Sequence, residues 1–191
     1  MVAPAHKPAT FEDLLACEDP DRLEIIGGEL VEKAAPSPGH SRSEIKIGAA
    51  IDPFNRTAGP RGPGGWWVFT EIHVGYPGGE TYSHDVAGWR RDRVPTQPKE
   101  WPVRLRPDWV CEILSPSHER HDLVVKPRVL HTTGVPHYWV LEPEDQILLV
   151  HRWSPDGYTI VQRAAAGETV RAEPFDAIEL PVSAMFGDDD E

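Results

Sequence analysis

Two acidic residues interrupt apolar stretches of the sequence that otherwise have the composition of buried strands. Asp85 comes directly before an apolar pair, and Glu112 lies inside the run Trp109–Leu114. Burying a carboxylate is costly unless it is paired with a cation or binds a metal. Any fold of this chain therefore has to supply both carboxylates with partners. Together with Lys126, which follows them, they form a set suited to metal-assisted cleavage of a phosphodiester.

The length of 191 residues predicts one domain, which we place at residues 1–186, followed by an acidic tail at 187–191. No apolar run reaches the ~18 residues of a membrane-spanning helix, so we expect no membrane partner. The N-terminal segment MVAPAHKPAT lacks the apolar core of a secretion signal, which predicts a cytoplasmic protein. The two cysteines, Cys17 and Cys111, give no disulfide framework.

The charge of the chain is uneven. A net charge of −12 argues against a general nucleic-acid binder. Residues 85–130, however, carry 9 basic and 7 acidic side chains, a balance of +2. The basic residues that cluster between the two acidic stretches are Arg90, Arg91, Arg93, Lys99, Arg104 and Arg106. This cluster is open to two interpretations, a solvated loop or a surface that contacts phosphates.

Helical and strand-like segments follow one another in an order that predicts an α+β fold with a mixed sheet. A Gly27-Gly28 turn predicts one β-hairpin, and Pro155–Gly157 predicts another. The predicted helices span residues 11–15, 40–54 and 122–133, and the predicted strands span 22–26, 29–32, 66–76, 82–89, 106–114, 138–141, 147–153 and 158–161. The apolar face expected for residues 40–54 consists of Ile45, Ile47, Ala49, Ala50 and Ile51.

An ordered set of segments carries a resemblance to a known family. These segments are Leu23–Val31, Pro36–His40, Asp85-Val86, Pro107–Ser117, Lys126 and Gly134–Val140. At these spacings the chain resembles the Uma-type restriction endonucleases of the PD-(D/E)XK nuclease superfamily, from about Phe11 to Phe186. The resemblance implies a restriction-endonuclease-like fold, with a central mixed β-sheet flanked by helices. It also implies metal-dependent hydrolysis of DNA, which makes DNA the expected partner.

The expected cofactor is Mg²⁺, or Mn²⁺ in its place. Mg²⁺ needs only one or two carboxylates besides water and substrate, so Asp85 and Glu112 suffice, with the carbonyl of Ile113 as a third ligand. The superfamily places its lysine two residues after the glutamate, but this chain has Leu114 there. The resemblance assigns that role to Lys126. Because Pro127 is excluded from a helix interior, we expect the regular helix to begin near Lys126.

Two further residues are candidate accessories of the site. The resemblance indicates Glu24 as a helper carboxylate and His40 as a residue that lines the site. Alternative interpretations remain open at this point: Glu112 paired with an arginine, Lys126 as a solvated helix residue, and His40 as a capping residue.

Three functions are weighed. The sharpest hypothesis is a metal-dependent DNA endonuclease with Asp85, Glu112 and Lys126 as catalytic residues. The alternative is a nuclease-fold binding or assembly protein without catalysis, because fold alone does not determine function. A weaker hypothesis is a zinc hydrolase that uses His118 and His121. A homodimer is also expected, because nucleases that cut both strands often act as symmetric pairs, and Leu148–Trp153 is the strand proposed to pair.

Overall fold

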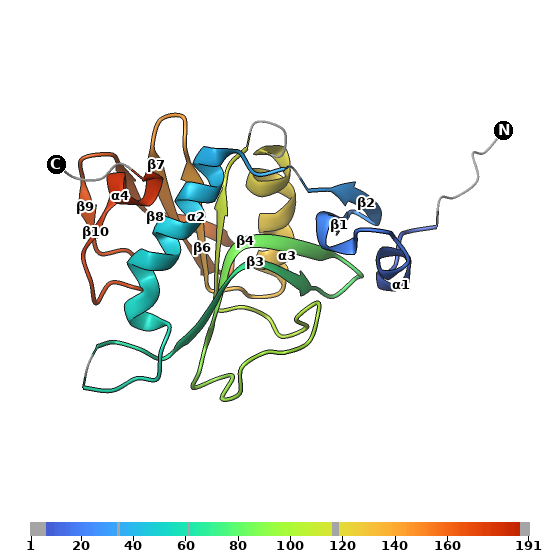
Figure 1. Ribbon diagram of the computed structural model, residues 1–191, viewed down its shortest axis with the longest axis horizontal. Helices are drawn as coiled ribbons and strands as arrows, with labels where there is room; N and C mark the ends of the chain where they lie inside the picture. The colour runs from blue at the N-terminus through green and yellow to red at the C-terminus, as the bar shows by residue number, and fades with distance from the viewer. Residues whose placement is uncertain (1–6, 34, 61, 116–118, 188–191) are drawn as a thin grey trace.

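A mixed β-sheet runs through the centre of the molecule (Figure 1). The computed structural model describes residues 7–33, 35–60, 62–115 and 119–187. In this part of the chain the sheet has the order β2-β1-β4-β5-β6-β7-β8, and β3 pairs with β4. Its strands are β1 Leu23–Ile26, β2 Glu29–Glu32, β3 Trp66–Gly75, β4 Thr81–Arg90, β5 Trp109–Ile113, β6 His137–Glu142, β7 Ile147–Ser154 and β8 Gly157–Ala165.

The only parallel neighbours in the described sheet are β5 and β6. Parallel strands cannot be joined by a tight turn and need a crossover. Here the crossover contains a π-helical turn, η3 (His121–Val125), followed by α3 (Lys126–Thr132). Residues 119–120 are already helical, so Lys126 and Pro127 follow the π-helical turn inside a continuous helical segment and do not begin it, contrary to the prediction from the sequence. Gly134 ends the crossover helix with a φ of 76°, which glycine adopts without strain.

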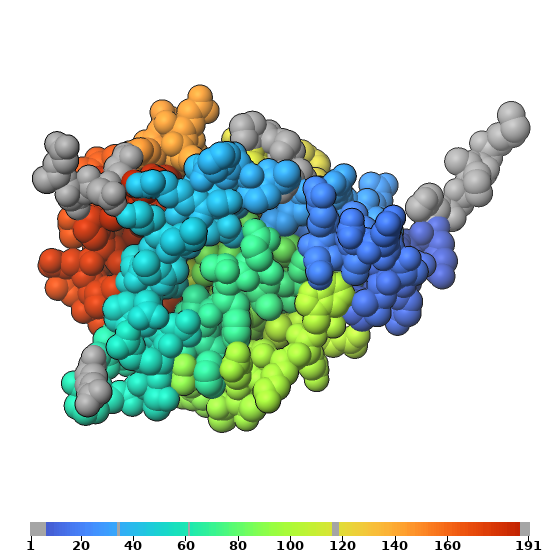
Figure 2. All heavy atoms as spheres, viewed as in Figure 1, coloured from blue at the N-terminus to red at the C-terminus, as the bar shows by residue number. Residues whose placement is uncertain are grey.

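Helices cover both faces of the sheet. On one face, α2 (Pro38–Ile51) packs over β3, β4 and β5, and α4 (Val182–Phe186) packs against α2 and β8. On the other face, Leu130 of α3 packs against Tyr138 and Val140. Figure 2 shows α2 as a ridge on the molecular surface. The remaining elements are α1 Phe11–Leu15, η1 Pro20–Arg22, η2 Asp52–Phe54 and a small sheet of β9 Thr169–Val170 with β10 Leu180–Pro181.

Three predictions from the sequence are wrong in detail. Ile45 is 71% exposed, and α2 buries Glu44 in the core-facing stripe instead. Strand β5 begins at Trp109 and not at residue 106, because Asp108 uses its carboxylate to accept hydrogen bonds from the Arg90–Arg93 turn. Strand β7 pairs with β6 on one side and β8 on the other, so it has no free edge for a second chain.

The alternation of side chains reverses in the middle of the β3–β4 pair. Phe69 and Ile72 pack against the same core cluster although they are three positions apart, which in a regular strand would place them on opposite faces. Between them, Glu71 has a φ of 47°, in the left-handed region that non-glycine residues rarely adopt. The register places Asp85 opposite Glu71. The reversal therefore occurs where Asp85 enters the candidate site.

The aromatic cluster under α2 yields a test of the core. Phe175 is fully buried, with its ring centroid 4.8 Å from that of Trp109 and 4.8 Å from that of Phe54. We expect Phe175→Ala to lower the free energy of unfolding by ~3–5 kcal/mol, because it removes apolar contacts and leaves a cavity. Urea denaturation measures this change. The exposed Ile45→Ala serves as control and should change stability by less than ~0.5 kcal/mol; equal effects would contradict this description of the core.

Candidate active site

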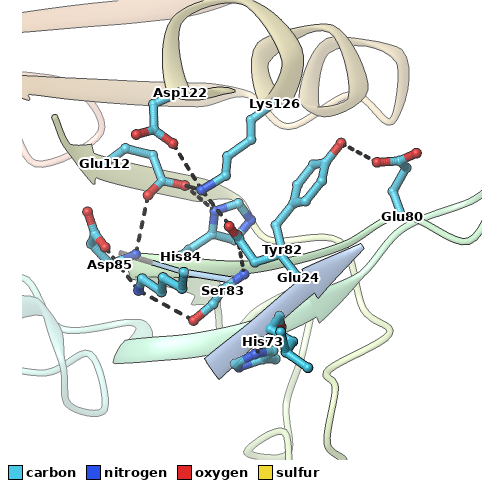
Figure 3. A network of polar contacts seen from close by, with 12 residues as sticks. Glu24, His73, Glu80, Tyr82, Ser83, His84, Asp85, Glu112, Asp122 and Lys126 are labelled. Atoms are coloured by element: carbon cyan, nitrogen blue, oxygen red, sulfur yellow. Dashed lines mark hydrogen bonds and ion pairs between the residues drawn. The ribbon is translucent and has the colours of Figure 1, made fainter. Parts of the chain in front are cut away.

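A cavity of about 620 Å³ lies where α2 and the crossover helix meet the sheet. Every site residue predicted from the sequence lines it: Glu24, His40, Asp85, Glu112, Ile113 and Lys126. They come from five separate elements, β1, α2, β4, β5 and α3. Figure 3 shows the carboxylates of Glu24, Glu112 and Asp122 directed at the amine of Lys126.

Lys126 is buried among three carboxylates. Its Nζ lies 3.2 Å from Glu24 Oε1, 3.4 Å from Glu112 Oε1 and 3.0 Å from Asp122 Oδ1, and its side chain is 4% exposed. Burial alone disfavours the ammonium, but the carboxylates outweigh it and raise the pKa of Lys126. The interpretation of Lys126 as a solvated residue is therefore wrong.

Glu112 is held by a buried chain of hydrogen bonds. Its Oε1 lies 2.6 Å from Nδ1 of His84, and Nε2 of His84 lies 2.6 Å from the hydroxyl of Tyr76. Burial, and then the charge of Lys126, lower the pKa of His84 to about 3, so the imidazole is neutral. A proton on Nδ1 satisfies both contacts, because Nδ1–H donates to Glu112 while Nε2 accepts from Tyr76. Glu112 has no arginine partner among the described residues.

Both carboxylate oxygens of Asp85 have polar partners. Oδ2 accepts a hydrogen bond of 2.7 Å from the backbone N–H of Ile113. Oδ1 lies 3.2 Å from Nζ of Lys33 and 3.3 Å from Nε2 of His40. Burial opposes ionisation, but His40 and Lys33 lower the pKa of Asp85 overall, so it is a carboxylate. The short bond to Ile113 joins Asp85 to the strand that carries Glu112.

Negative charge exceeds positive charge in the site. Three carboxylates share the one ammonium of Lys126. Burial raises the pKa of Glu112 to about 8 and that of Asp122 to about 6, which means that these groups retain protons where isolated acids would have lost them. A divalent cation would relieve this imbalance, and the oxygen-rich donor set suits Mg²⁺ or Mn²⁺.

A second acidic group adjoins the first through Asp85. One donor atom from each of His40, Glu44, Glu71 and Asp85 lies within 4.8 Å of the others. Glu44 is 8% exposed, and its Oε1 has no hydrogen-bond partner in the described chain. Burial and the proximity of Glu71 raise the pKa of Glu44 to about 8. Lys33 contacts this group too, with Nζ 2.6 Å from Glu71 Oε2.

Several residues of the site were not predicted from the sequence: Lys33, Glu44, Glu71, His84 and Asp122. For two of these residues, the spacing in the sequence gives a signal. Asp122 precedes Lys126 by four residues, and Glu44 follows His40 by four, the spacing that aligns side chains on one helical face. Lys33 and Glu71 had none, because they come from strands far apart in the sequence and meet only through the sheet.

The sequence also suggested alternative roles for two histidines and an acidic tail. His40 does not cap α2, because Ser37 accepts the hydrogen bond of its backbone N–H. His118, proposed for a zinc site with His121, lies outside the described residues, as do residues 188–191 of the predicted tail.

The basic cluster is largely structural. Arg93 and Arg106 both pair with Asp108, and Arg90 pairs with Asp92. Arg91 stacks on Trp67, with its guanidinium carbon 3.4 Å from the centre of the ring. These contacts favour the interpretation of the cluster as a self-paired loop.

The raised pKa of Glu112 predicts a pH-dependent effect of Glu112→Gln on stability. In the metal-free wild type the contribution of Glu112 declines as the pH rises from its ordinary value of 4.5 to about 8, because the folded state retains a proton that the unfolded state has lost. Glutamine removes this decline. With EDTA present, the variant should be more stable than wild type at pH 8 by on the order of 1–3 kcal/mol, and by less at pH 5.

Urea denaturation at the two pH values measures this difference, with Glu29→Gln on the exposed strand β2 as control. A stability difference between Glu112→Gln and wild type that is the same at both pH values would contradict the assignment.

Comparisons with known proteins agree with this architecture. No described helix is long and apolar enough to cross a membrane. A search of curated proteins finds no match. Among solved structures, a similar one is the crystal structure described as "a putative nuclease" from Anabaena variabilis ATCC 29413. It has 20% sequence identity and a TM-score of 0.68, and the match covers 94% of this chain and 98% of that one.

This likeness confirms the predicted fold, a restriction-endonuclease-like mixed sheet flanked by helices. A family model with the description "Putative restriction endonuclease" matches residues 8–183, which is nearly the whole chain. The chain therefore belongs to the Uma2 family.

Proposed function

We propose that the protein is a metal-dependent endonuclease that hydrolyses DNA phosphodiester bonds, with Mg²⁺ or Mn²⁺ held by Asp85, Glu112 and the carbonyl of Ile113. The observation that carries this proposal is the surplus of buried carboxylates around Lys126 on the wall of one cavity. Membership in a family described as "Putative restriction endonuclease" supports the same activity.

The residues that line the cavity have different roles in the proposed reaction. Asp85, Glu112 and the carbonyl of Ile113 would hold the cation, which would supply polarisation of a phosphoryl oxygen and a more acidic water. The ammonium of Lys126 is placed to stabilise negative charge that develops on the phosphate. Glu24 and Asp122 hold that ammonium beside Glu112. His84 orients Glu112 through its hydrogen bond. Residues that hydrogen-bond to a metal ligand commonly fix its orientation in this way.

The proposal also includes DNA as the substrate, a cytoplasmic location and assembly as a homodimer. The acidic chain is expected to make few phosphate contacts, so binding to DNA should be weak and is best measured at low salt. In the described sheet β8 is an edge strand, and it carries the exposed side chains of Ile160 and Val161. We therefore assign the pairing of two copies to β8 in place of Leu148–Trp153.

The first test is cleavage of plasmid DNA at low salt. Purified protein should nick supercoiled plasmid with Mg²⁺ or Mn²⁺ and should be inert with EDTA, because hydrolysis needs a metal-bound water. Asp85→Asn and Glu112→Gln should each slow cleavage by ~10²-fold or more, whereas Glu29→Gln should cleave at the wild-type rate. Cleavage that persists in EDTA would contradict the proposal. Binding of DNA without cleavage under either metal would favour the non-catalytic alternative.

The second test concerns Lys126. Lys126→Met should lower the turnover rate by ~10²-fold, because one preorganised electrostatic donor is lost. We also expect lower stability, by ~3–5 kcal/mol in the metal-free protein, because three buried carboxylates lose their cation. Lys126→Arg should not restore activity, since a planar guanidinium does not replace a compact ammonium. Gel assays of cleavage and urea denaturation measure the two effects separately.

A matched double variant separates catalysis from folding. Lys126→Met combined with Asp122→Asn removes one charge of each sign and should recover part of the stability but none of the activity. Adding Leu114→Lys returns an amine to the wall of the same cavity and should recover part of the activity. Wild-type cleavage by Lys126→Met would show that this lysine has no catalytic role.

A further inference from the structure

Three exposed arginines have no partner within the part of the chain that the structure describes. Most of the described arginines have a carboxylate, an aromatic ring or a backbone carbonyl against the guanidinium group. The side chains of Arg120, Arg128 and Arg163 are exposed, and within the described ranges they make no ion pair, hydrogen bond or ring contact. They lie outside the self-paired basic cluster of residues 90–106, and their charge remains available to a partner.

We propose that Arg120, Arg128 and Arg163 bind the phosphate backbone of duplex DNA on the face of the molecule that carries the crossover helix. This inference rests on the proposed function, because it states where the substrate of that site is held. A free guanidinium can donate two parallel hydrogen bonds to one phosphate, and each such contact releases counterions from the DNA. Because the chain has a net charge of −12, it needs local unpaired cations to bind a polyanion.

Arg120 and Arg128 lie on the crossover segment that carries two residues of the site. Arg120 precedes the buried Asp122 by two positions, and Arg128 follows the buried Lys126 by two. Two positions correspond to about 200° of rotation on a helix, so the arginines face solvent where Asp122 and Lys126 face the cavity. The same segment therefore holds the site on its inner side and carries two cations on its outer side.

The register of the sheet places Arg163 on the face that carries Glu112. Across the strands, Glu112 pairs with Val140 and Val140 pairs with Leu149. Leu149 in turn pairs with Arg163. Partners in such a row project from the same face of the sheet. Three strand spacings separate the ends of the row by ~14 Å, which is the axial rise of about four nucleotides. One strand of DNA can therefore place one phosphate at Arg163 and a nearby phosphate at the cavity.

The part of the sheet that carries Arg163 is accessible on this side. Trp153 of β7 is 38% exposed and Ile160 of β8 is 44% exposed. The ring of Trp153 stacks on that of His131 in α3, so this exposed surface lies beside the crossover helix. The pairing of two copies proposed for β8 uses the hydrogen-bonding edge of that strand, whereas Arg163 projects from its face. The two contacts are therefore compatible.

Acidic side chains at the end of β6 limit the direction from which DNA can approach. Glu142 and Glu144 line the cavity. The carboxylate of Glu142 accepts hydrogen bonds from the backbone N–H groups of Glu144 and Asp145, which keeps three acidic residues in one turn. Their negative charge repels phosphates at this rim. The DNA backbone is therefore expected over the crossover helix and β8, and not over this turn.

The dependence of DNA binding on salt tests this surface without reference to cleavage. The full-length protein, kept in EDTA, is titrated against a fluorescein-labelled duplex at several NaCl concentrations, and fluorescence anisotropy gives the affinity. Arg120→Gln, Arg128→Gln and Arg163→Gln should each reduce the slope of log affinity against log salt by ~0.9, and the triple variant should reduce it by ~2.7. Between ~50 and ~200 mM NaCl, the wild type should then lose ~40-fold more affinity than the triple variant. Because phosphate contacts carry no sequence information, two duplexes of unrelated sequence should respond alike.

Arg171→Gln is the matched control, because Arg171 is exposed but lies 3.2 Å from Glu179 in an ion pair. It should leave the slope unchanged, and thermal unfolding verifies that every variant is folded. No binding by the wild type, an unchanged slope in the triple variant or an equal change in Arg171→Gln would overturn the surface even if DNA is cleaved. A reduced slope in the triple variant of a protein that cleaves no DNA would uphold the surface and refute the nuclease proposal. If the triple variant alters the oligomeric state and not the DNA affinity, this face binds a second copy and the inference is wrong.

Discussion

The contact between the Lys126 ammonium and three buried carboxylates links the sheet to the helices around the site. Glu24 comes from β1, Glu112 from β5 and Asp122 from the π-helical turn, so one cation joins three elements that are distant in the sequence. An ion group of this kind tolerates burial only when every charge has partners. The position of the crossover helix, which carries Lys126, is tied to this requirement.

Asp85 extends the same constraint to the other side of the site. One of its oxygens accepts the backbone N–H of Ile113, and the other faces Lys33 and His40. It therefore stands between the carboxylates gathered around Lys126 and the group formed with Glu44 and Glu71. The reversal of alternation in β3 and β4 occurs at this residue, which indicates that the sheet is distorted where its polar side chains must reach both groups.

Much of the architecture was predictable from local signals. Apolar runs and the Gly27-Gly28 turn indicated elements that the structure contains, with differences of a few residues at their ends. The failures have specific causes. Helix α2 buries Ile47 and Ile51 as predicted, but it buries Glu44 and exposes Ile45, which hydrophobicity alone did not indicate. Strand β7 was expected to pair with a second chain, but β6 and β8 already pair with both of its edges.

Composition was enough to predict that Asp85 and Glu112 would be buried, because each lies within an apolar stretch, and that each would need a cation or a metal as partner. The tertiary structure alone decided which cations meet them. Lys33 reaches Asp85 from the end of a different hairpin, and His84 reaches Glu112 across the β4–β5 pair. These partners lie between 28 and 52 positions apart along the chain, so no local pattern specifies them; the register of the sheet and the packing of the helices do.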